Sequence, residues 1–275
     1  MFWFKNIHAF NLVKYGYVAL VIRPLIGVSV VLVLPFAGVA FPNSINTPST
    51  QHFAPAPGGS HKDPYLICEK GTRQSPIDIS TTSLHETQGD LIFRYTPTPI
   101  HVVHDGHSVQ AINEAPSMVI YRGSAYQLLQ LHFHEPSEHH IDGNSSVMEM
   151  HLVHKNSQGQ ILVVGVFIQA GTANQEVLRA GDWIQQRLGH RTVEKGEDVT
   201  GEFMLDVMKL LPQNQSHYFT YDGSLTTAPC TEGVTWVVLK QPIEVSQEQV
   251  RRFVRAYGHT AREVQTLEDR EILSH

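Results

Sequence analysis

The stretch Gln130-Leu131-His132-Phe133-His134 decides both the fold and the candidate site of this 275-residue chain. Polar and apolar residues alternate along it, and this alternation indicates a half-buried β-strand. Because successive side chains of a strand point to opposite faces, His132 and His134 share one face. The apolar residues between and before them point the other way, into apolar packing.

A second stretch, Glu149-Met150-His151-Leu152-Val153, alternates in the same way, so that its first, third and fifth residues share a face. If the two stretches are neighbouring strands, their three imidazoles converge on one point. Three nitrogen ligands with a fourth position left open are typical of a catalytic zinc site, whereas a structural zinc site has four protein ligands. The sequence therefore predicts Zn²⁺ as a cofactor, held by His132, His134 and His151.

Short strands separated by turn residues account for most of the chain after residue 62. We expect strands over 91–95, 100–104, 108–112, 118–121, 126–134, 147–155, 161–169, 218–221 and 235–239. Two helices are expected, one over 174–188 and one from Ser246 to near Gly258, where Ser246 and Gln249 match a capping box. These elements predict a mainly β (α/β roll-like) single domain, with a large, mostly antiparallel twisted central sheet and short peripheral helices.

The charge of the chain argues against two classes of partner. The formal net charge is -6, and the sequence contains no basic cluster. Nucleic acid and anionic membrane surfaces attract basic proteins. We therefore expect no nucleic-acid partner and look for a small-molecule substrate.

The N-terminus carries a candidate targeting segment. An uncharged run over 24–40 follows Lys5, Lys14 and Arg23 and ends in small residues. It is shorter than the ~20 apolar residues that a membrane span needs. We interpret residues 1–40 as a signal peptide, with an uncleaved N-terminal anchor as the alternative, so that the protein would be periplasmic or secreted. Residues 41–62 are rich in Pro, Ser, Thr and Gly, which predicts a flexible linker or arm before a catalytic domain over 63–275.

The two cysteines, Cys68 and Cys230, fit either one disulfide or two unrelated thiols. Export to an oxidising compartment favours the disulfide. Closing a loop of about 160 residues would stabilise the fold by about 4–5 kcal/mol in the chain-entropy account.

Further motifs accompany the histidines in a fixed order. They are Gln74-Ser75-Pro76-Ile77-Asp78-Ile79, Gly106-His107, Ser137-Glu138-His139, Ser224-Leu225-Thr226-Thr227 and Val234-Thr235-Trp236-Val237-Val238-Leu239. In this order and spacing, and together with the two histidine stretches, they strongly resemble an α-class carbonic anhydrase of the secreted bacterial type. The resemblance extends from Asp63 to Arg270, and the cysteine pair matches the disulfide of secreted members.

The resemblance implies an enzyme, a carbonate dehydratase of the lyase class. Such an enzyme hydrates CO2 reversibly to bicarbonate and a proton by means of a zinc-bound hydroxide. Thr226 would accept a hydrogen bond from the hydroxide and donate its own proton to Glu138. His107 would act as the proton shuttle, although a histidine beside a turn glycine can also be merely solvated.

Other residues of the resemblance would orient the ligands or receive the substrate. Gln130 and Glu149 would fix the imidazole orientations, and a backbone carbonyl near Thr260 would serve His134. The CO2 pocket would be lined by Val153, Val163, Leu225, Thr227, Val234 and Trp236. The resemblance also implies inhibition by anions and sulfonamides, and a homodimer by analogy with bacterial members. The alternatives are a carbonic-anhydrase-like non-catalytic binding module, which would lack a zinc histidine, and zinc esterase chemistry as a side activity.

Two departures concern the proton route. The aromatic N-terminal segment that members of the family carry, with a Trp and a Tyr, has no counterpart before Asp63. Asp105 stands where an Asn is common, and Gln110 is a further polar substitution nearby. A carboxylate at position 105 would raise the pKa of His107 or hold its ring in one orientation.

Overall fold

The computed structural model describes the backbone of 8–10, 17–22 and 30–35, and residues 66–275 except 83, 87–88, 106–107 and 189–190. The chain divides into two units, Met1–Gly59 and Ser60–His275. In the first unit, β1 (His8–Phe10), β2 (Tyr17–Ile22) and β3 (Val30–Pro35) pair as an antiparallel sheet. Most of the predicted signal peptide over 1–40, and all of the predicted linker over 41–62, lies outside the described residues.

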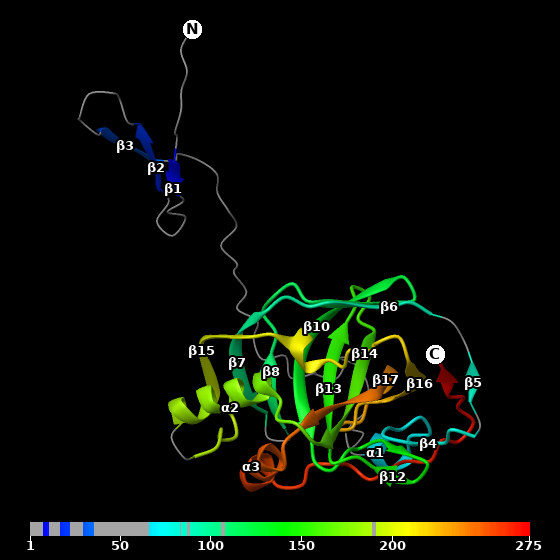
Figure 1. The fold of residues 1–275 in the computed structure, drawn as a ribbon. Helices are drawn as coiled ribbons and strands as arrows, with labels where there is room; N and C mark the ends of the chain where they lie inside the picture. Colours follow the sequence, from blue (N-terminus) through cyan, green and yellow to red (C-terminus); the bar gives the residue numbers. More distant parts are fainter. Residues whose placement is uncertain are drawn as a thin grey trace. The chain divides into compact units, whose positions relative to one another are not determined.

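The second unit is built on one twisted sheet, to which the described residues contribute twelve strands (Figure 1). In spatial order its main path runs through β15 (Asp198–Leu205), β7 (Thr98–His104), β8 (Val109–Ile112), β10 (Ser124–His134), β13 (Met148–Lys155), β14 (Ile161–Ala170), β17 (Glu232–Val245), β16 (Tyr218–Ser224), β18 (Leu273–Ser274) and β5 (His85–Glu86). Off this path, β9 (Met118–Tyr121) pairs with β10 and with β6 (Leu91–Arg94). Most pairs are antiparallel, and β14 runs parallel to β17. The predicted fold class is confirmed.

The register of the central strands places the histidines on one face. His132 on β10 lies opposite His151 on β13, and His134 lies opposite Glu149. On β14, Gly165 lies opposite His151. The predicted central strand over 161–169 is therefore real, and it lies next to the strand that carries the third histidine.

The helices lie at the periphery of the sheet, as the sequence predicts. They are α1 (Leu66–Lys70), α2 (Gln175–Leu188), the 3-10 helix η2 (Val207–Leu210) and α3 (Gln247–Tyr257). Asn174 caps α2, because its Oδ1 accepts hydrogen bonds from the backbone N–H groups of Glu176 and Val177. The predicted capping box of Ser246 and Gln249 is present, and α3 ends at Gly258 with φ 74°. None of the described helices is long and apolar enough to cross a bilayer.

The two faces of the sheet carry separate apolar clusters. Leu131, Met150 and Leu152, which alternate with the histidines, belong to the larger cluster, against which Val177 of α2 and Phe253 of α3 pack. The second cluster lies on the histidine face and includes Val153, Val163, Val234 and Trp236. A small sheet of β12 (Asn144–Ser145), β11 (His140–Ile141) and β4 (Asp78–Ile79) supports the segment after β10.

Candidate metal centre

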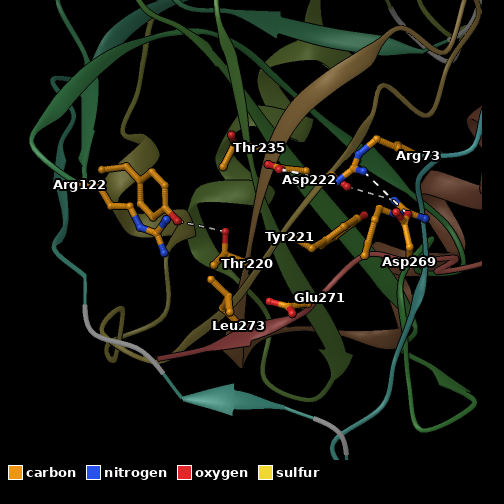
Figure 2. A pocket seen from close by; sticks show the side chains of 11 residues that line it. Arg73, Arg122, Thr220, Tyr221, Asp222, Thr235, Asp269, Glu271 and Leu273 are labelled. Carbon is orange, nitrogen blue, oxygen red and sulfur yellow. Dashed lines mark hydrogen bonds and ion pairs between the residues drawn. The ribbon is translucent and has the colours of Figure 1, made fainter.

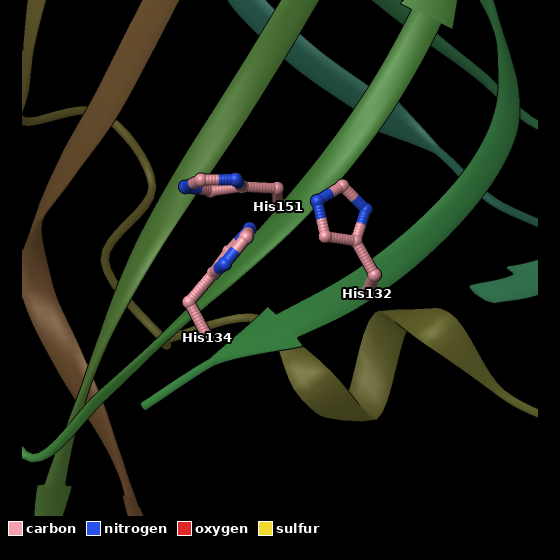
Figure 3. A group of neighbouring side chains, drawn as sticks. All are labelled: His132, His134 and His151. Atoms are coloured by element: carbon pink, nitrogen blue, oxygen red, sulfur yellow. The ribbon is translucent and has the colours of Figure 1, made fainter. Parts of the chain in front are cut away.

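Three imidazoles converge at the centre of the sheet, where β10 and β13 pair (Figure 3). The ring centroids of His132 and His134 are 4.9 Å apart, those of His132 and His151 are 5.3 Å apart, and those of His134 and His151 are 4.7 Å apart. One nitrogen from each ring lies within 4.8 Å of the other two. All three side chains are buried. The convergence predicted from alternation is thus present in the structure.

Each imidazole is held by a hydrogen bond at one nitrogen, which leaves the other nitrogen free. Nδ1 of His132 lies 2.8 Å from Oε1 of Gln130, and Nδ1 of His134 lies 3.1 Å from the carbonyl oxygen of Thr260. His151 is held at its other nitrogen, with Nε2 3.0 Å from Oε1 of Glu149. The nitrogens left free are therefore Nε2 of His132, Nε2 of His134 and Nδ1 of His151. Of these, Nε2 of His134 is buried without a hydrogen-bond partner among the described residues. Oriented imidazoles that each leave one nitrogen free fit a metal of the zinc type.

The protonation tendencies of the three rings differ. Burial lowers the pKa of His132 well below its usual value, and the charges of His134 and His151 lower it further. Burial also lowers the pKa of His134. For His151 burial acts in the same direction, but the charge and hydrogen bond of Glu149 and the charge of Glu138 outweigh it, so the pKa is raised. Two rings therefore present lone pairs at neutral pH without competition from a proton.

Glu149 is a fully buried carboxylate whose oxygens are both occupied. Oε1 lies 2.8 Å from Nδ1 of His139 and 3.0 Å from Nε2 of His151, while Oε2 accepts the backbone N–H groups of Glu138 and His139 at 3.0 and 2.8 Å. Burial alone would raise the pKa of Glu149, but the two histidines outweigh it and hold this pKa well below the usual range. The carboxylate is therefore charged and fixed.

Glu138 is the second buried carboxylate beside the histidines. Its Oε1 accepts the backbone N–H of Arg262 at 2.8 Å and lies 3.3 Å from Nδ1 of His134. Its Oε2 lies 3.8 Å from Nδ1 of His151 and has no hydrogen-bond partner among the described residues. Thr226, the predicted partner of Glu138, is half-buried in the loop that follows β16, and the described residues show no hydrogen bond between the two. Oε2 of Glu138 is thus available to accept a hydrogen bond, on the side of the carboxylate that lies near His151.

The predicted apolar wall lies along the same face of the sheet. Val153, Val163, Val234 and Trp236 belong to one cluster, and Leu225 packs at its edge. The Trp236 ring lies 4.8 Å from the His151 ring, and its Nε1 donates to the carbonyl oxygen of Ser224 at 2.9 Å. Thr227 is half-buried, and its carbonyl oxygen accepts the backbone N–H of Cys230.

The predicted shuttle residue, His107, lies outside the described residues, and so does Gly106. Gln110, three residues beyond the gap, lies opposite His132 in the β8–β10 register. Its amide donates to Oδ2 of Asp105 at 2.6 Å and to Oγ of Ser108 at 3.1 Å. The two polar departures from the family pattern are therefore bonded to each other.

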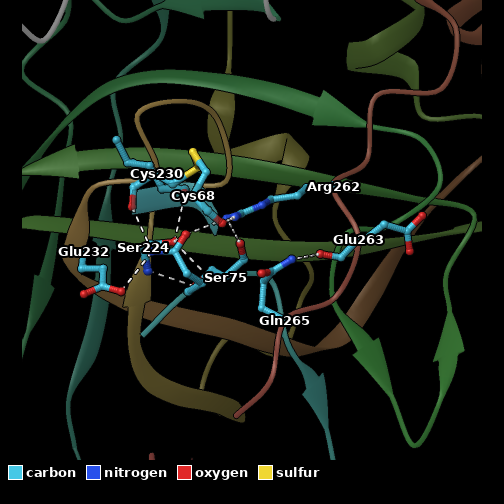
Figure 4. The surroundings of a disulfide bond; sticks show 10 residues. Cys68, Ser75, Ser224, Cys230, Glu232, Arg262, Glu263 and Gln265 are labelled. Carbon is cyan, nitrogen blue, oxygen red and sulfur yellow. Dashed lines mark hydrogen bonds between the residues drawn. A yellow bond between two sulfur atoms is a disulfide. The ribbon is translucent and has the colours of Figure 1, made fainter. Parts of the chain in front are cut away.

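The disulfide between Cys68 and Cys230 is present (Figure 4). It joins the α1 region to the loop that carries Leu225, Thr226 and Thr227. This pairing confirms the interpretation of the two cysteines as one bridge rather than two free thiols.

Two contributors to the site were not predicted as such. Tyr221 continues the hydrogen-bond network of Glu149 through His139. Its hydroxyl lies 2.7 Å from Nε2 of His139 and donates to Oγ of Ser75 at 2.8 Å. Gly165 leaves room for Glu149, since a Cβ there would lie 2.8 Å from Oε1 of that carboxylate. A glycine inside an otherwise β-branched strand was the available signal, because such a glycine often marks a close approach.

A polar pocket of about 390 Å³ contains none of the predicted site residues (Figure 2). It is lined by Arg73, Tyr121, Arg122, Thr220, Tyr221, Asp222, Thr235, Asp269, Arg270, Glu271 and Leu273. The lining contains three arginines and three acidic residues, and Arg73 lies within 4.0 Å of the Asp222 and Asp269 carboxylates, so the lining has no excess of either charge. The three histidines, whose side chains could bind a metal ion, lie outside this pocket.

Comparison with known proteins shows the family of the chain. Residues 58–275 match the profile of the eukaryotic-type carbonic anhydrases. A carbonic anhydrase of Nostoc sp. is 38% identical over 213 residues, which are 76% of this chain and 78% of the relative. A carbonic anhydrase of Klebsiella pneumoniae is 35% identical, over 80% of this chain and 87% of the relative. Among solved structures, the α-carbonic anhydrase of Thermovibrio ammonificans in complex with the inhibitor sulfanilamide superposes with a TM-score of 0.69. It is 35% identical, and the match covers 76% of this chain and 90% of that one.

Proposed function

The chain is a carbonic anhydrase of the eukaryotic-type, or α, family, and we propose that it hydrates CO2 reversibly with a zinc ion held by three histidines. One observation carries this proposal. Three buried imidazoles are each fixed by a hydrogen bond at one nitrogen, and one nitrogen of each ring lies within 4.8 Å of a nitrogen of both other rings. The second group of possible metal ligands among the described residues, His139, Glu149 and His151, shares His151 with this one, and both oxygens of its Glu149 are already hydrogen-bonded.

His132, His134 and His151 would hold the zinc through Nε2, Nε2 and Nδ1. When bound, the ion supplies the Lewis acidity that makes hydroxide available from water at neutral pH. The chain then has to fix the three rings, and it does so with Gln130, the Thr260 carbonyl and Glu149. Each partner holds one tautomer and one ring orientation.

Glu138 and Thr226 would select the nucleophile by the direction of their hydrogen bond. A carboxylate can only accept hydrogen bonds, so the Thr226 hydroxyl would donate to the free Oε2 of Glu138. The Thr226 oxygen is then left as an acceptor toward the metal. A group with a proton to donate is favoured there, and a group without one is not.

The apolar wall would hold CO2, which has no net dipole and gains little from polar contacts. Val153, Val163, Val234, Leu225 and Trp236 supply apolar surface next to the histidines. Thr227 lies at the same loop and would line the edge of this wall.

His107 would carry the product proton to buffer, since an imidazole can exchange protons near neutral pH. Asp105 and Gln110 flank His107 in the sequence and are hydrogen-bonded to each other, and Gln110 lies opposite His132 on the sheet. We propose that this pair helps to organise the polar groups along the path by which the proton leaves the site.

Three further expectations follow from the family. Sulfonamide and anion inhibition is proposed by analogy with the Thermovibrio structure, which holds sulfanilamide. Export to the periplasm or medium is consistent with the disulfide. A homodimer is proposed by analogy with bacterial relatives, and light scattering of the purified protein would test it.

Stopped-flow CO2 hydration tests the proposed function. The zinc-loaded protein, the chelated protein and the chelated protein with zinc restored are compared, with sulfanilamide added to the first. We expect a rate that disappears on chelation, returns with zinc and is suppressed by sulfanilamide. His132→Ala should abolish it, while His85→Ala, an exposed histidine of β5, should not. A zinc-loaded wild-type protein with no rate above buffer would instead indicate a non-catalytic module.

A further inference from the structure

Arg262 lies on the C-terminal segment, near the disulfide (Figure 4), and it forms hydrogen bonds in two directions, to Glu138 and to residues 68–75. Its backbone N–H donates to Oε1 of Glu138 at 2.8 Å. Its half-buried guanidinium donates to the carbonyl oxygens of Cys68 and Ser75 at 2.8 and 2.7 Å, and to Oε1 of Gln74 at 3.0 Å. All of these side-chain hydrogen bonds therefore go to uncharged oxygens of one segment, residues 68–75.

That segment is in turn bonded to the loop that carries Thr226. Ser75 and Ser224 exchange two hydrogen bonds, from each backbone N–H to the other's Oγ, at 2.9 and 3.1 Å. The Gln74 amide donates to the carbonyl oxygen of Cys230 at 3.1 Å. Residues 68–75 thus contact the Arg262 side chain on one side and both ends of the 224–230 loop on the other.

The position of the free Glu138 oxygen depends on how the other oxygen is held. Oε1 is fixed by the backbone of Arg262, and Oε2 is then directed to within 3.8 Å of Nδ1 of His151. If the backbone at 262 moved, the carboxylate would be free to rotate. A planar guanidinium can hold three acceptors in fixed directions, which a lysine ammonium on a flexible stem does less well.

We propose that the Arg262 side chain is a positioning residue for the reaction: through residues 68–75 it fixes Glu138 and the Thr226 loop relative to each other. The proposal rests on the proposed function, because it assigns Glu138 and Thr226 their hydrogen-bond relay. Among the described residues, the hydrogen bonds of Arg262 go to Glu138 and to residues 68–75 and not to the three histidines, so it would act through Glu138. By fixing the Glu138–Thr226 hydrogen bond, Arg262 would determine whether the metal site favours ligands that can donate a proton to the Thr226 oxygen.

The test compares Arg262→Ala and Arg262→Lys with Arg270→Ala. Arg270 is a matched control, a buried arginine of the same C-terminal segment whose guanidinium also donates to carbonyl oxygens, those of Leu267, Asp222 and Thr266. Zinc content, kcat/KM for CO2, and inhibition by sulfanilamide and by thiocyanate are measured for each protein. Sulfanilamide has an N–H to donate to the Thr226 oxygen, and thiocyanate has no proton.

For Arg262→Ala we expect full zinc content and a loss of about tenfold in kcat/KM, the size expected when a hydrogen bond to a charged group is released. The ratio of the sulfanilamide to the thiocyanate inhibition constant should rise about tenfold as well, because a released Thr226 hydroxyl can rotate and donate to a protonless anion. Arg262→Lys should lie between the wild type and Arg262→Ala. Arg270→Ala should lose thermal stability with an unchanged ratio.

Crystal structures of the metal-free variants give a readout that does not depend on activity. In Arg262→Ala the Glu138 carboxylate should leave the position that it occupies here, and in Arg270→Ala it should keep it. An unmoved Glu138 in Arg262→Ala, or a ratio that changes equally in Arg270→Ala, would overturn the proposal. If Arg262→Ala does not fold, Arg262→Lys decides by the same criteria. A wild-type protein without CO2 hydration would defeat the proposed function, whereas the metal-free structures would still decide whether Arg262 holds Glu138.

Discussion

Glu149 binds His151 at Nε2, at 3.0 Å from its Oε1, whereas the other two histidines of the cluster are held at Nδ1. The third ring therefore presents Nδ1 to the other two. Because Glu149 is charged and both of its oxygens are occupied, it fixes the ring orientation and also joins β13 to the segment at 138–139.

Glu149→Gln should weaken zinc binding by about 10- to 100-fold, because the amide has only one accepting oxygen for four donors. We also expect a loss of about 1–3 kcal/mol in the free energy of unfolding, since a buried donor is left unpaired. Zinc affinity is measured by competition with a chelating dye. Glu244→Gln is the control, because Glu244 also accepts a backbone N–H, that of Thr172, but is exposed. Equal zinc affinity in both variants would contradict the role of Glu149.

Gly165→Ala should damage the same site from the neighbouring strand. The added Cβ would lie 2.8 Å from Oε1 of Glu149, so the carboxylate or the strand must shift. We expect about 1–3 kcal/mol of destabilisation and weaker zinc binding. Gly181→Ala in α2 is the control, since nothing lies within 4 Å of its Cβ position, and there alanine should stabilise the helix by about 0.5–1 kcal/mol. Urea unfolding of the metal-free proteins measures both changes, and the same sign for the two would refute the packing argument.

His107→Ala should slow turnover in weak buffer by about 10- to 100-fold, in keeping with the loss of a group that transfers protons. Added imidazole should restore the rate, because a free base can replace the missing side chain. His85→Ala, which removes an exposed histidine, should leave turnover and its buffer dependence unchanged. Turnover in the His107 variant that is normal in weak buffer would show that the proton leaves by another route.

The site was predictable where it depends on alternation and spacing. The shared face of His132, His134 and His151 follows from period two, and the capping box at Ser246 follows from local sequence. Features of this kind can be predicted from the sequence because each depends on contacts within a few residues, or with one neighbouring strand.

What the sequence did not indicate depends on contacts between distant segments. Strand β15 was not predicted, because it is an edge strand with exposed polar residues and with Gly201, which leaves room for the Trp183 ring. Strand β17 was expected to end at 239, but it continues past Pro242 to Val245. The Arg262 contacts join residues more than 180 positions apart, and no local pattern specifies them.

His154 should make the stability of the metal-free protein fall in acid. Its Nε2 lies 2.7 Å from the Tyr95 hydroxyl and its Nδ1 lies 3.2 Å from the carbonyl oxygen of Leu162, an arrangement that suits the neutral ring. Burial lowers the pKa of His154 from 6.5 to about 3. The unfolded chain therefore takes up the proton first as the pH falls. The contribution to stability is complete above pH 6.5 and is lost progressively down to about pH 3, with a total of about 4–5 kcal/mol at about 1.4 kcal/mol per pH unit.

His154→Gln tests this dependence, because glutamine keeps one donor and one acceptor but does not titrate in this range. At pH 7 the variant should be less stable than the wild type by about 1–3 kcal/mol, from imperfect bonds to Tyr95 and Leu162. Between pH 6.5 and pH 4 the gap should narrow and then reverse, because only the wild type loses the His154 contribution. Urea unfolding of the chelated proteins at several pH values measures the gap. The other buried histidines titrate in both proteins and cancel in the difference. Parallel stability curves over this range would mean that His154 is not held neutral by its burial.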